Sequence, residues 1–438
     1  MYRDLTKGKI SRSLLLFALP MMAGNLLQQF YNIADTLIVG RVLGRNALAA
    51  VGSAYTLMTF LTSIFLGLSM GSGALFSIYR GRGDEESLKS AIAHAFGLIM
   101  TVTLLLNVAV YLLIDPILTF LRVPAEVWDG MRQYLLVIFA GLAATSLYNF
   151  FSCLLRALGN SMVSLVFLAV SALLNIGLDL LFVAVLPWGI GGAALATILA
   201  QYVSGVGISL YVLLRCRSLL PDPRGLRFDR KILREITGLS SLTCLQQSVM
   251  NFGILMVQGL VNSFGPIVMA AFSAAVKIDT FAYLPVQDFG NAYSTFVAQN
   301  YGAGNRARIR RGTREAFVIS IVFSLAVSAL VCLFAAPLMR IFVSASETAV
   351  IASGVHYLRI EGAFYCGIGC LFLLYGYYRA VKRAEMSVVL TVISLGTRVL
   401  LAYGLSACLG ETGIWMAIPI GWILADAAGL AYLKRTSF

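Results

Sequence analysis

Charged side chains are scarce in this chain of 438 residues: Asp, Glu, Lys and Arg together make up 12% of it. A soluble protein carries about twice that share, so the composition excludes an ordinary water-soluble domain. Hydrophobic residues make up 59%, and the mean hydropathy is +0.85. Because apolar stretches of about 20 residues cross a bilayer as helices, we expect an integral membrane protein.

Catalytic and metal-binding patterns are also missing. Cys366 and Cys370 stand four residues apart, but no second pair completes a zinc site. The spacing of the seven cysteines indicates no disulfide framework, and no nucleophile elbow, P-loop or HExxH occurs. An enzyme embedded in the membrane would have only His94 and His356 available, both near the ends of apolar segments. We therefore expect no enzyme, no cofactor and no structural metal.

Twelve apolar segments are long enough to span a membrane. In the first half they cover residues 13–39, 47–77, 92–114, 132–155, 163–186 and 190–214. In the second half they cover residues 237–263, 268–298, 315–336, 352–379, 386–408 and 413–433. The longest polar segment lies between the halves. The sequence therefore predicts a six-helix bundle over residues 1–214, a cytoplasmic linker over 215–236 and a second six-helix bundle over 237–438.

The positive charges are distributed unevenly over the predicted loops. Of the 33 Lys and Arg residues, 25 fall on the side that holds both termini, 5 on the other side and 3 within the spans. Cytoplasmic loops carry this excess in membrane proteins, so we expect both termini in the cytoplasm and the chain in the plasma (inner) membrane. The net charge of +13 is explained by these loops, and we expect no nucleic-acid partner.

The two halves resemble each other. ALAAVGSAYTLMTF at residues 47–60 aligns with VMAAFSAAVKIDTF at residues 268–281, an offset of 221, and YRGRGD at 79–84 aligns with NYGAGN at 300–305. Each half has an even number of spans, so both enter from the same side as parallel repeats. This architecture occurs in secondary transporters, with the substrate site between the halves. We expect an all-α membrane protein with twelve transmembrane helices in two parallel-repeat six-helix bundles.

Polar side chains form a stripe on one face of the first span and of the seventh. The first stripe consists of Asn25, Gln28, Asn32 and Asp35, and the second of Gln247, Asn251, Gln258 and Asn262. An unpaired polar group in hydrocarbon is costly, so we expect both stripes to line a central substrate cavity. Hydrogen bonds between helices, worth about 0.6–2 kcal/mol each, are the alternative for the amides. The charge of Asp35 would cost about 2.5–3.5 kcal/mol at a helix centre and favours a functional role.

Three spans of the first half place oxygen-bearing side chains at one depth. Asp35, Asp179 and Thr197 lie five to eight residues inside the outer ends of their spans, or roughly 8–12 Å at 1.5 Å per residue. Asn175 lies one helical turn deeper than Asp179. Two close carboxylates are not easily ionised together, and hard oxygen ligands suit a sodium ion. These residues therefore predict a proton or sodium site, with a purely structural polar cluster as the alternative.

The second half lacks this set, since Asn175 aligns with Arg398 at an offset of 223. Its spans hold other charged residues, of which we take four as candidate substrate contacts. These are Lys277, Asp288, Glu361 and Arg398. Ion pairs of Lys277 with Asp288, or of Arg398 with Asp288 or Glu361, are the structural alternative. Further charges stand at Asp279, Arg359 and Asp426, and we expect a structural role for Asp426.

Pro20 lies in the first span, where proline removes a helix hydrogen bond. Our hypothesis is that protonation of Asp35 bends this helix at Pro20 and alters the cavity. A static kink is the alternative.

The motifs together resemble those of the multidrug and toxic compound extrusion (MATE) transporters. The resemblance rests on LPMMAGNLLQQFYNIADTLIVG (19–40), ALAAVG (47–52), FVAQNYGAG (296–304) and the twelve spans. It implies two six-helix bundles in a V shape and export of amphipathic, often cationic compounds in exchange for protons or sodium.

Within the family, the chain is closest in motif to the DinF-like branch. That resemblance implies a cation site at Asp35, Asn175, Asp179 and Thr197 and a bending proline at Pro20. The NorM-like branch adds acidic residues on spans 7 and 10. Here span 7 has none, and Glu361 lies near the corresponding place on span 10.

We therefore expect an ion-coupled antiporter for multidrug efflux and xenobiotic transport that works by alternating access. Its partners would be small amphipathic molecules and membrane lipids, its coupling ion H⁺ or Na⁺, and its functional unit a monomer. A flippase for lipid-linked precursors, from the same superfamily, is the alternative. Such relatives usually have two further spans and a more basic cavity.

Overall fold

The computed structural model describes residues 3–120, 123, 125–220 and 228–436. These residues form helices and no strand. Part of the predicted linker, residues 221–227, lies outside the described residues.

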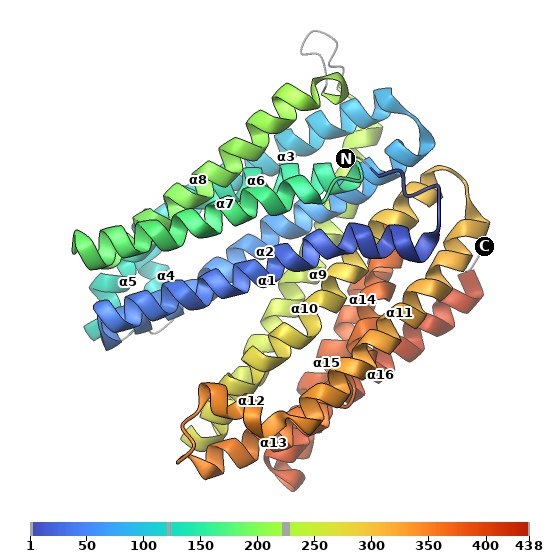
Figure 1. The fold of residues 1–438 in the computed structure, drawn as a ribbon. Helices are drawn as coiled ribbons and strands as arrows, with labels where there is room; N and C mark the ends of the chain where they lie inside the picture. Colours follow the sequence, from blue (N-terminus) through green and yellow to red (C-terminus); the bar gives the residue numbers. More distant parts are fainter. Residues whose placement is uncertain (1–2, 121–122, 124, 221–227, 437–438) are drawn as a thin grey trace. The chain divides into compact units, whose positions relative to one another are not determined.

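The described residues of the first half form eight α-helices (Figure 1). They are α1 (Ile10–Val42), α2 (Arg45–Arg82), α3 (Glu85–Leu112), α4 (Ile114–Phe120), α5 (Ala125–Ile138), α6 (Leu142–Ala157), α7 (Met162–Asp179) and α8 (Gly189–Arg215). A 3₁₀ turn, η1 (Phe139–Gly141), joins α5 to α6, and a π-helical segment, η2 (Leu180–Val185), extends α7. A second 3₁₀ turn, η3 (Arg217–Leu219), follows α8.

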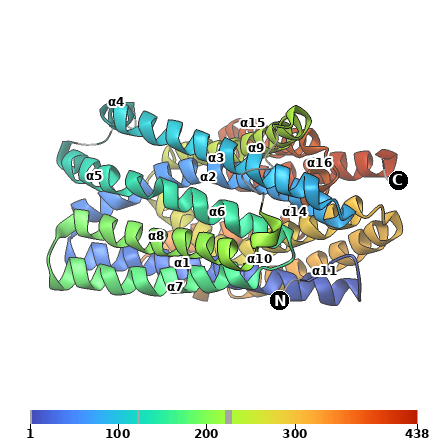
Figure 2. The same cartoon turned by 90° about the horizontal axis from the view of Figure 1, so that it is seen from above.

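The second half repeats this order of elements. It consists of α9 (Arg230–Asn262), α10 (Pro266–Gly302), α11 (Arg306–Leu333), α12 (Ala335–Phe342), α13 (Thr348–Gly362), α14 (Tyr365–Ala380), α15 (Ala384–Leu409) and α16 (Glu411–Thr436). Both views show α7 beside α8, and likewise α15 beside α16 (Figures 1 and 2).

Eleven helices of the described chain are long and apolar enough to cross a membrane, and a bent pair brings the number to twelve. The pair is α13 and α14, which meet at an angle of 50°. The prediction of an all-α protein with twelve spans is confirmed, but the tenth span is not the continuous helix expected over 352–379. Around Phe364 the backbone hydrogen bonds tighten to a three-residue spacing, from Phe364 N to Glu361 O (3.0 Å) and from Gly367 N to Phe364 O (2.8 Å).

Two short helices, α4 and α12, were not predicted. Each has a proline in its first turn, Pro116 in α4 and Pro337 in α12, and these prolines occupy equivalent positions of the two repeats. Proline is tolerated in a first turn but cannot continue a preceding helix, because it lacks an N–H and clashes with the turn before it. The long helices α3 and α11 therefore end just before these prolines, and a new helix starts at each.

The repeat is visible in the backbone. Gly83 follows α2 with φ 74°, and Gly304, its counterpart in the second half, follows α10 with φ 70°. Glycine adopts such positive φ values at little cost because it has no Cβ. In both halves this glycine turns the chain from the second long helix into the third.

The chain divides into two compact units. Leu19–Cys244 forms most of unit 1, and Asp4–Ala18 joins the residues from Leu245 onward in unit 2. The division therefore passes through α1 and through α9, so the first helix of each half begins in one unit and ends in the other. The predicted boundaries at 214 and 237 follow the order of the spans and stay a prediction.

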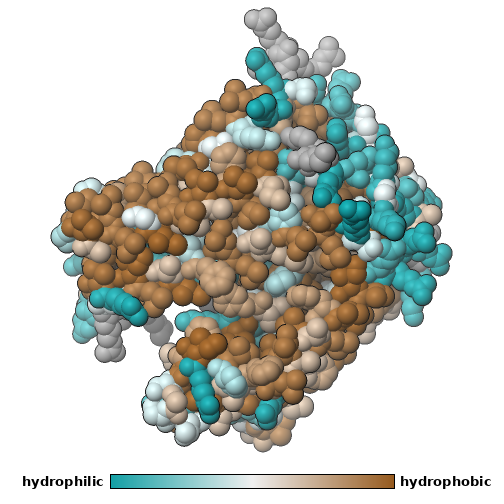
Figure 3. All heavy atoms as spheres, viewed as in Figure 1, coloured by the Kyte–Doolittle hydropathy of each residue, from teal (hydrophilic) through white to brown (hydrophobic). Residues whose placement is uncertain are grey.

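The membrane helices carry apolar side chains outside and small polar ones inside. Helix α3 exposes Leu104 (65%) and Leu112 (76%), whereas its Thr103 is buried and forms a 2.7 Å hydrogen bond with Ser146. On the face seen in Figure 3, apolar residues cover most of the surface and hydrophilic residues gather toward the helix ends. This is the pattern expected of helices solvated by lipid.

Large aromatic side chains fill the core of unit 2. Trp415 is fully buried, stacks on Phe272 with 5.5 Å between ring centroids, and meets Tyr357 edge to face at 4.8 Å. Such offset and T-shaped contacts suit the ring quadrupoles. The packing holds α10, α13 and α16 together and fixes the position of the Tyr357 hydroxyl beside buried carboxylates.

Candidate functional site

Two carboxyl groups of unit 1 face each other. Asp35 comes from α1 and Asp179 is the last residue of α7, and the two groups lie close enough to interact electrostatically. Asp179 is fully buried, and neither of its oxygens has a partner at hydrogen-bond geometry in the described part of the chain. Among the residues that the structure describes, no basic side chain interacts with either carboxyl. A buried acid beside a half-buried one, without a counter-cation, favours uptake of a proton or a metal cation.

An amide and a hydroxyl complete the set. Asn175, one turn before Asp179 and 2% exposed, donates from Nδ2 to the Thr197 hydroxyl on α8 over 3.4 Å. Thr197 donates to the carbonyl of Ala193 at 3.1 Å. This leaves the Asn175 Oδ1 atom buried without a hydrogen-bond partner among the described residues. An unused buried oxygen beside two carboxylates is a ligand suited to a hard cation.

The backbone changes its winding directly after this cluster. Residues Leu180–Val185 form a π-helical segment that continues α7. Phe182 in this segment stacks on Trp188, with 4.7 Å between the centroids and 21° between the rings. Single π turns are rare and often occur at functional sites because they re-aim the adjacent side chains.

Tyr134 was missed by the sequence reasoning. It lies on α5, is buried, and interacts with both carboxyl groups and with Thr197. Tyr31, on the same helix as Asp35, also interacts with Asp35. The available signal was a single hydroxyl on the otherwise apolar buried face of α5, formed by Met131, Tyr134, Leu135 and Ile138.

The cluster offers the kinds of ligand that a small cation takes. It offers two carboxylates, a carboxamide and hydroxyls, all of them oxygen donors. No group of three or more His, Cys, Asp or Glu that could hold a metal ion occurs in the described residues. The arrangement can therefore exchange a proton, or hold a sodium ion at Asp35, Asn175, Asp179 and Thr197.

The remaining residues of the α1 stripe are half-buried. Asn25, Gln28 and Asn32 lie on the successive turns of α1 that precede Asp35 in the sequence. Gln28 interacts with the Tyr31 hydroxyl, which links the stripe to the carboxyl cluster.

The stripe on α9 is largely satisfied along its own helix. Asn251 donates to the backbone oxygen of Gln247 at 3.1 Å, and the Gln258 amide donates to Asn262 at 2.8 Å. Gln247 is buried and lines a recess within unit 2.

Unit 2 has a carboxyl cluster of its own. Asp279 on α10 and Glu361 on α13 are buried and interact with each other and with Tyr357. The Tyr365 hydroxyl donates to Asp279. Asp279 was not among the candidate site residues, because only the tertiary structure brings it to Glu361.

The ion pairs weighed as the structural alternative in the second half do not form within 4 Å in the described chain. Arg398 interacts with Glu361 at longer range, and its guanidinium lies 5.7 Å above the Trp422 ring. Lys277 is exposed, with its amine 5.8 Å from the centre of the Phe342 ring, and makes no ion pair with Asp288. Asp288 is buried on α10.

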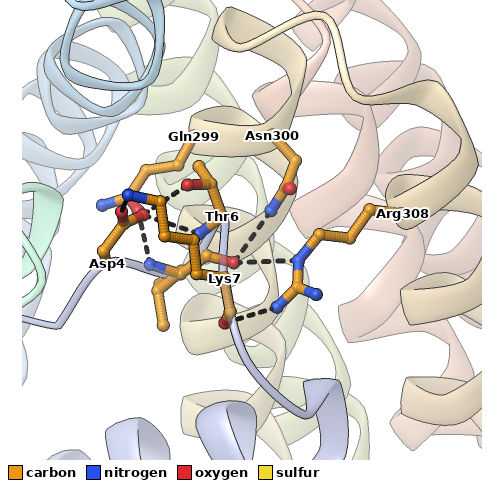
Figure 4. Close-up of polar contacts among 7 residues, drawn as sticks. Asp4, Thr6, Lys7, Gln299, Asn300 and Arg308 are labelled. Atoms are coloured by element: carbon orange, nitrogen blue, oxygen red, sulfur yellow. Dashed lines mark hydrogen bonds and ion pairs between the residues drawn. The ribbon is translucent and has the colours of Figure 1, made fainter.

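Pro20 is buried in α1, two residues after the point where the helix passes from unit 2 to unit 1. The segment before it is held by polar contacts (Figure 4). Arg308 on α11 donates to the backbone oxygens of Leu5 (3.3 Å), Lys7 (2.8 Å) and Gly8 (2.8 Å). Gln299 and Asn300 on α10 bond both the N–H and the carbonyl of Leu5, each at 3.2 Å. The start of α1 is thereby fastened to unit 2.

Comparison with known proteins places this geometry in a family. The MatE family model matches the chain twice, over residues 20–181 and 242–404. The two matches begin at equivalent places in the two halves, in agreement with the repeat found in the sequence. Together they cover more than half of the chain.

Individual proteins are similar over nearly the full length. The chain is 31% identical to the probable multidrug resistance protein YpnP of Bacillus subtilis (strain 168) over 433 residues, covering 98% of this chain and 96% of that protein. It is 26% identical to the probable multidrug resistance protein YoeA of the same organism, over 96% of this chain and 92% of that one. A solved structure described as the outward-facing conformation of a multidrug resistance MATE family transporter matches with a TM-score of 0.93 and 24% identity, covering 98% of this chain and 96% of the other.

The family model, the relatives and the fold agree with one another, and the apolar helices make the chain a multi-pass membrane protein. The chain therefore belongs to the multidrug and toxic compound extrusion family of transporters.

Proposed function

We propose that the protein is a secondary active antiporter for multidrug efflux. It exports amphipathic, cationic organic compounds in exchange for H⁺ or Na⁺ by alternating access. The relatives named multidrug resistance proteins support the export of such compounds. The basic loops support a location in the plasma membrane with both termini in the cytoplasm.

One observation carries the proposal of ion coupling: the fully buried Asp179 faces Asp35 without a hydrogen-bond partner for its carboxylate in the described chain. Burying an uncompensated carboxylate is costly. The site therefore gains free energy when it takes up a proton or a sodium ion, and the difference in this gain between the two conformations of the transporter is the coupling energy of the proposed cycle. We also propose that the chain belongs to the DinF-like branch of the family, whose cation site these positions resemble.

Ion binding to the cluster would couple ion transport to substrate transport by changing the relative stability of the two conformations of the transporter. A ligand shifts a conformational equilibrium only as far as its affinities for the two states differ. Because α1 carries Asp35 and starts in unit 2, a change in how Asp35 pairs with α7 is transmitted along a helix that both units share. Pro20 is the proposed hinge.

Dye efflux from a pump-deficient bacterium tests the export function. Cells that express the protein should lose ethidium faster than empty-vector cells, and Asp35→Asn should abolish this gain. Retention of dyes and cationic drugs at the empty-vector level would reject multidrug export and favour the lipid-precursor flippase.

Purified protein in proteoliposomes identifies the ion. Imposed pH and sodium gradients are applied separately, and the coupling ion is the one whose gradient drives uptake of the dye. Transport that responds to neither gradient would reject ion coupling.

A further inference from the structure

His94 on α3 contacts the start of α9 within unit 1. Its Nδ1 atom lies 2.8 Å from the carbonyl oxygen of Ser90, one turn earlier on the same helix. Its Nε2 atom lies 3.2 Å from the backbone nitrogen of Asp229, the residue that precedes α9. The ring of Phe228 lies against the imidazole, with 5.5 Å between the ring centroids. A side chain of α3 thus holds the point at which α9 begins.

The two hydrogen bonds of His94 define the protonation state of its ring. A carbonyl oxygen can only accept, so Nδ1 carries the hydrogen and donates to Ser90. A backbone N–H can only donate, so Nε2 is the acceptor for Asp229. The pair of bonds requires the neutral imidazole, because both nitrogens are donors once the ring is protonated. Protonation would place an N–H group of the ring against the N–H of Asp229.

Asp229 connects this contact to the first turn of α9. Its Oδ1 atom accepts from the backbone N–H groups of Lys231 (2.8 Å) and Ile232 (3.2 Å), and so caps the helix. An imidazolium at His94 would repel the N–H of Asp229 and attract its carboxylate away from these two donors. Protonation of His94 therefore acts against the contact with α3 and against the cap of α9.

The start of α9 is fixed to unit 1 at two further places. Tyr79 on α2 donates to the Glu235 carboxylate at 3.0 Å, and the hydroxyl oxygens of Ser72 and Ser240 lie 2.9 Å apart. From Leu245 onward the helix belongs to unit 2. The contact at His94 lies closer to the predicted linker than either of these, so its loss frees the first turn of α9.

The chain has two histidines, and the other one, His356, belongs to unit 2. Charged side chains at this end of unit 1 stand on α3 and on the elements next to it. They are Glu86 and Lys89 on α3, Arg80 and Arg82 on α2, Arg156 on α6, Arg217 on η3, and Asp229, Arg230, Lys231, Arg234 and Glu235 at the start of α9. Side chains of these types ordinarily keep one charge between about pH 5 and 8, whereas histidine changes its charge in this range. The response of this contact to pH therefore belongs to His94.

We propose that His94 is a pH-sensitive tether. Its neutral ring holds the start of α9 against α3, and a proton taken up from the cytoplasm releases α9 and slows transport. The effect on transport rests on the proposed function, which places this end of unit 1 in the cytoplasm. Both units share α9, so movement passes less well between them when its first turn is no longer fixed.

Hydrogen exchange of the purified protein at residues 229–236 tests the tether. Amide exchange itself depends on pH, so wild type is compared with His94→Gln at the same pH, once at about pH 8 and once at about pH 5.5. Glutamine offers an amide oxygen as acceptor and takes up no proton. Wild type should match this variant at the higher pH and exchange about threefold or more faster at the lower pH, as expected for the loss of a hydrogen bond. Equal exchange at both pH values would overturn the proposal.

Two further variants are the controls. His94→Phe keeps a ring against Phe228 but removes the acceptor, so it should exchange faster than His94→Gln at both pH values. His356→Gln removes the other histidine and should behave like wild type. If His94→Phe exchanges as slowly as His94→Gln, the hydrogen bond to Asp229 does not hold α9 and the proposal is wrong.

Nitrogen NMR reports the ring without a change at position 94. Protein labelled with ¹⁵N-histidine, carrying His356→Gln and a purification tag free of histidine, has His94 as its one histidine. The spectrum should show a neutral ring with its hydrogen on Nδ1 at about pH 8 and an imidazolium at about pH 5.5. A ring that stays neutral at the lower pH would contradict the proposal. This measurement serves equally if His94→Gln does not fold.

Dye transport into inside-out membrane vesicles tests the consequence for function, because the buffer then bathes the cytoplasmic face. The driving force changes with pH in the same way for every variant. Between about pH 8 and about pH 5.5, wild type should therefore lose rate relative to His94→Gln. Identical pH profiles would reject the effect on transport. Exchange and NMR are measured without an ion gradient, so a lack of dye transport in every variant would reject the antiporter and leave the tether standing.

Discussion

The side-chain nitrogen of Asn175 lies 3.4 Å from the hydroxyl oxygen of Thr197 and joins α7 to α8 one turn away from Asp179. This contact positions the amide next to the two carboxyl groups while leaving its own oxygen unused.

Replacing Asp179 by asparagine should abolish ion-driven dye export while the protein stays folded. The amide keeps the size of the side chain but can neither exchange a proton nor offer a negative charge to sodium. Export is measured in cells, and folding by the thermal unfolding midpoint in detergent. Asp129→Asn, an exposed acid of the same unit, is the control and should export like wild type. Near-normal export by Asp179→Asn would remove this residue from the mechanism.

Replacing Pro20 by alanine should slow dye export if α1 bends there. Alanine restores a backbone N–H and is favoured over proline in a helix interior by about 3 kcal/mol, so the straight helix gains stability. The unfolding midpoint should therefore stay the same or rise while the export rate falls. Pro419→Ala, at a buried proline within α16, serves as the control. Undiminished export by Pro20→Ala would reject the hinge and leave a static kink.

The caps of α3 and α11 should differ in their response to pH. Asp84 caps α3 by accepting from the Ser87 backbone N–H at 3.0 Å, and Asn305, at the equivalent repeat position, accepts from Arg308 N–H at 3.2 Å. Alanine at either position should cost about 0.5–2 kcal/mol of stability at neutral pH.

Hydrogen bonds from the side chain and backbone of Ser87 hold the pKa of Asp84 below its ordinary value. The ionised carboxylate therefore stabilises the fold fully above that ordinary value, about 3.9, and this stabilisation is lost as the pH falls through the lowered pKa. The difference in unfolding midpoint between wild type and Asp84→Ala should shrink in acid, and that of Asn305→Ala should not. Equal responses of the two variants would contradict the assignment.

Replacing Arg308 by methionine should loosen the start of α1. The change removes the donors to three backbone oxygens, of Leu5, Lys7 and Gly8. Hydrogen exchange at residues 4–9 should become faster, because local opening costs less free energy when these bonds are gone. Arg310→Met, at an exposed position on the same helix, should leave the exchange unchanged. Unaltered exchange in Arg308→Met would show that other contacts hold the segment.

Local patterns in the sequence predicted much of this protein's structure. Apolar run length predicted the twelve spans, because a bilayer sets the length of a spanning helix. The constant offset between similar segments predicted the repeat, which the glycines at 83 and 304 show in the backbone. Depth counted along each span selected Asp35, Asn175, Asp179 and Thr197, which the structure brings together, because helical rise is constant.

Contacts between distant parts of the chain decided the rest. Tyr365 reaches Asp279 across 86 residues, and Asn300 reaches Leu5 across 295, and no periodicity within one helix records such pairs. The place of Tyr134 at the site depends on how separate helices pack side by side. The same is true of the recess of unit 2 that Gln247 and Arg379 line. The sequence by itself determined which segments enter the membrane and which of their faces are polar. Tertiary structure decided which of those faces meet, because meeting depends on the close packing of side chains from separate helices.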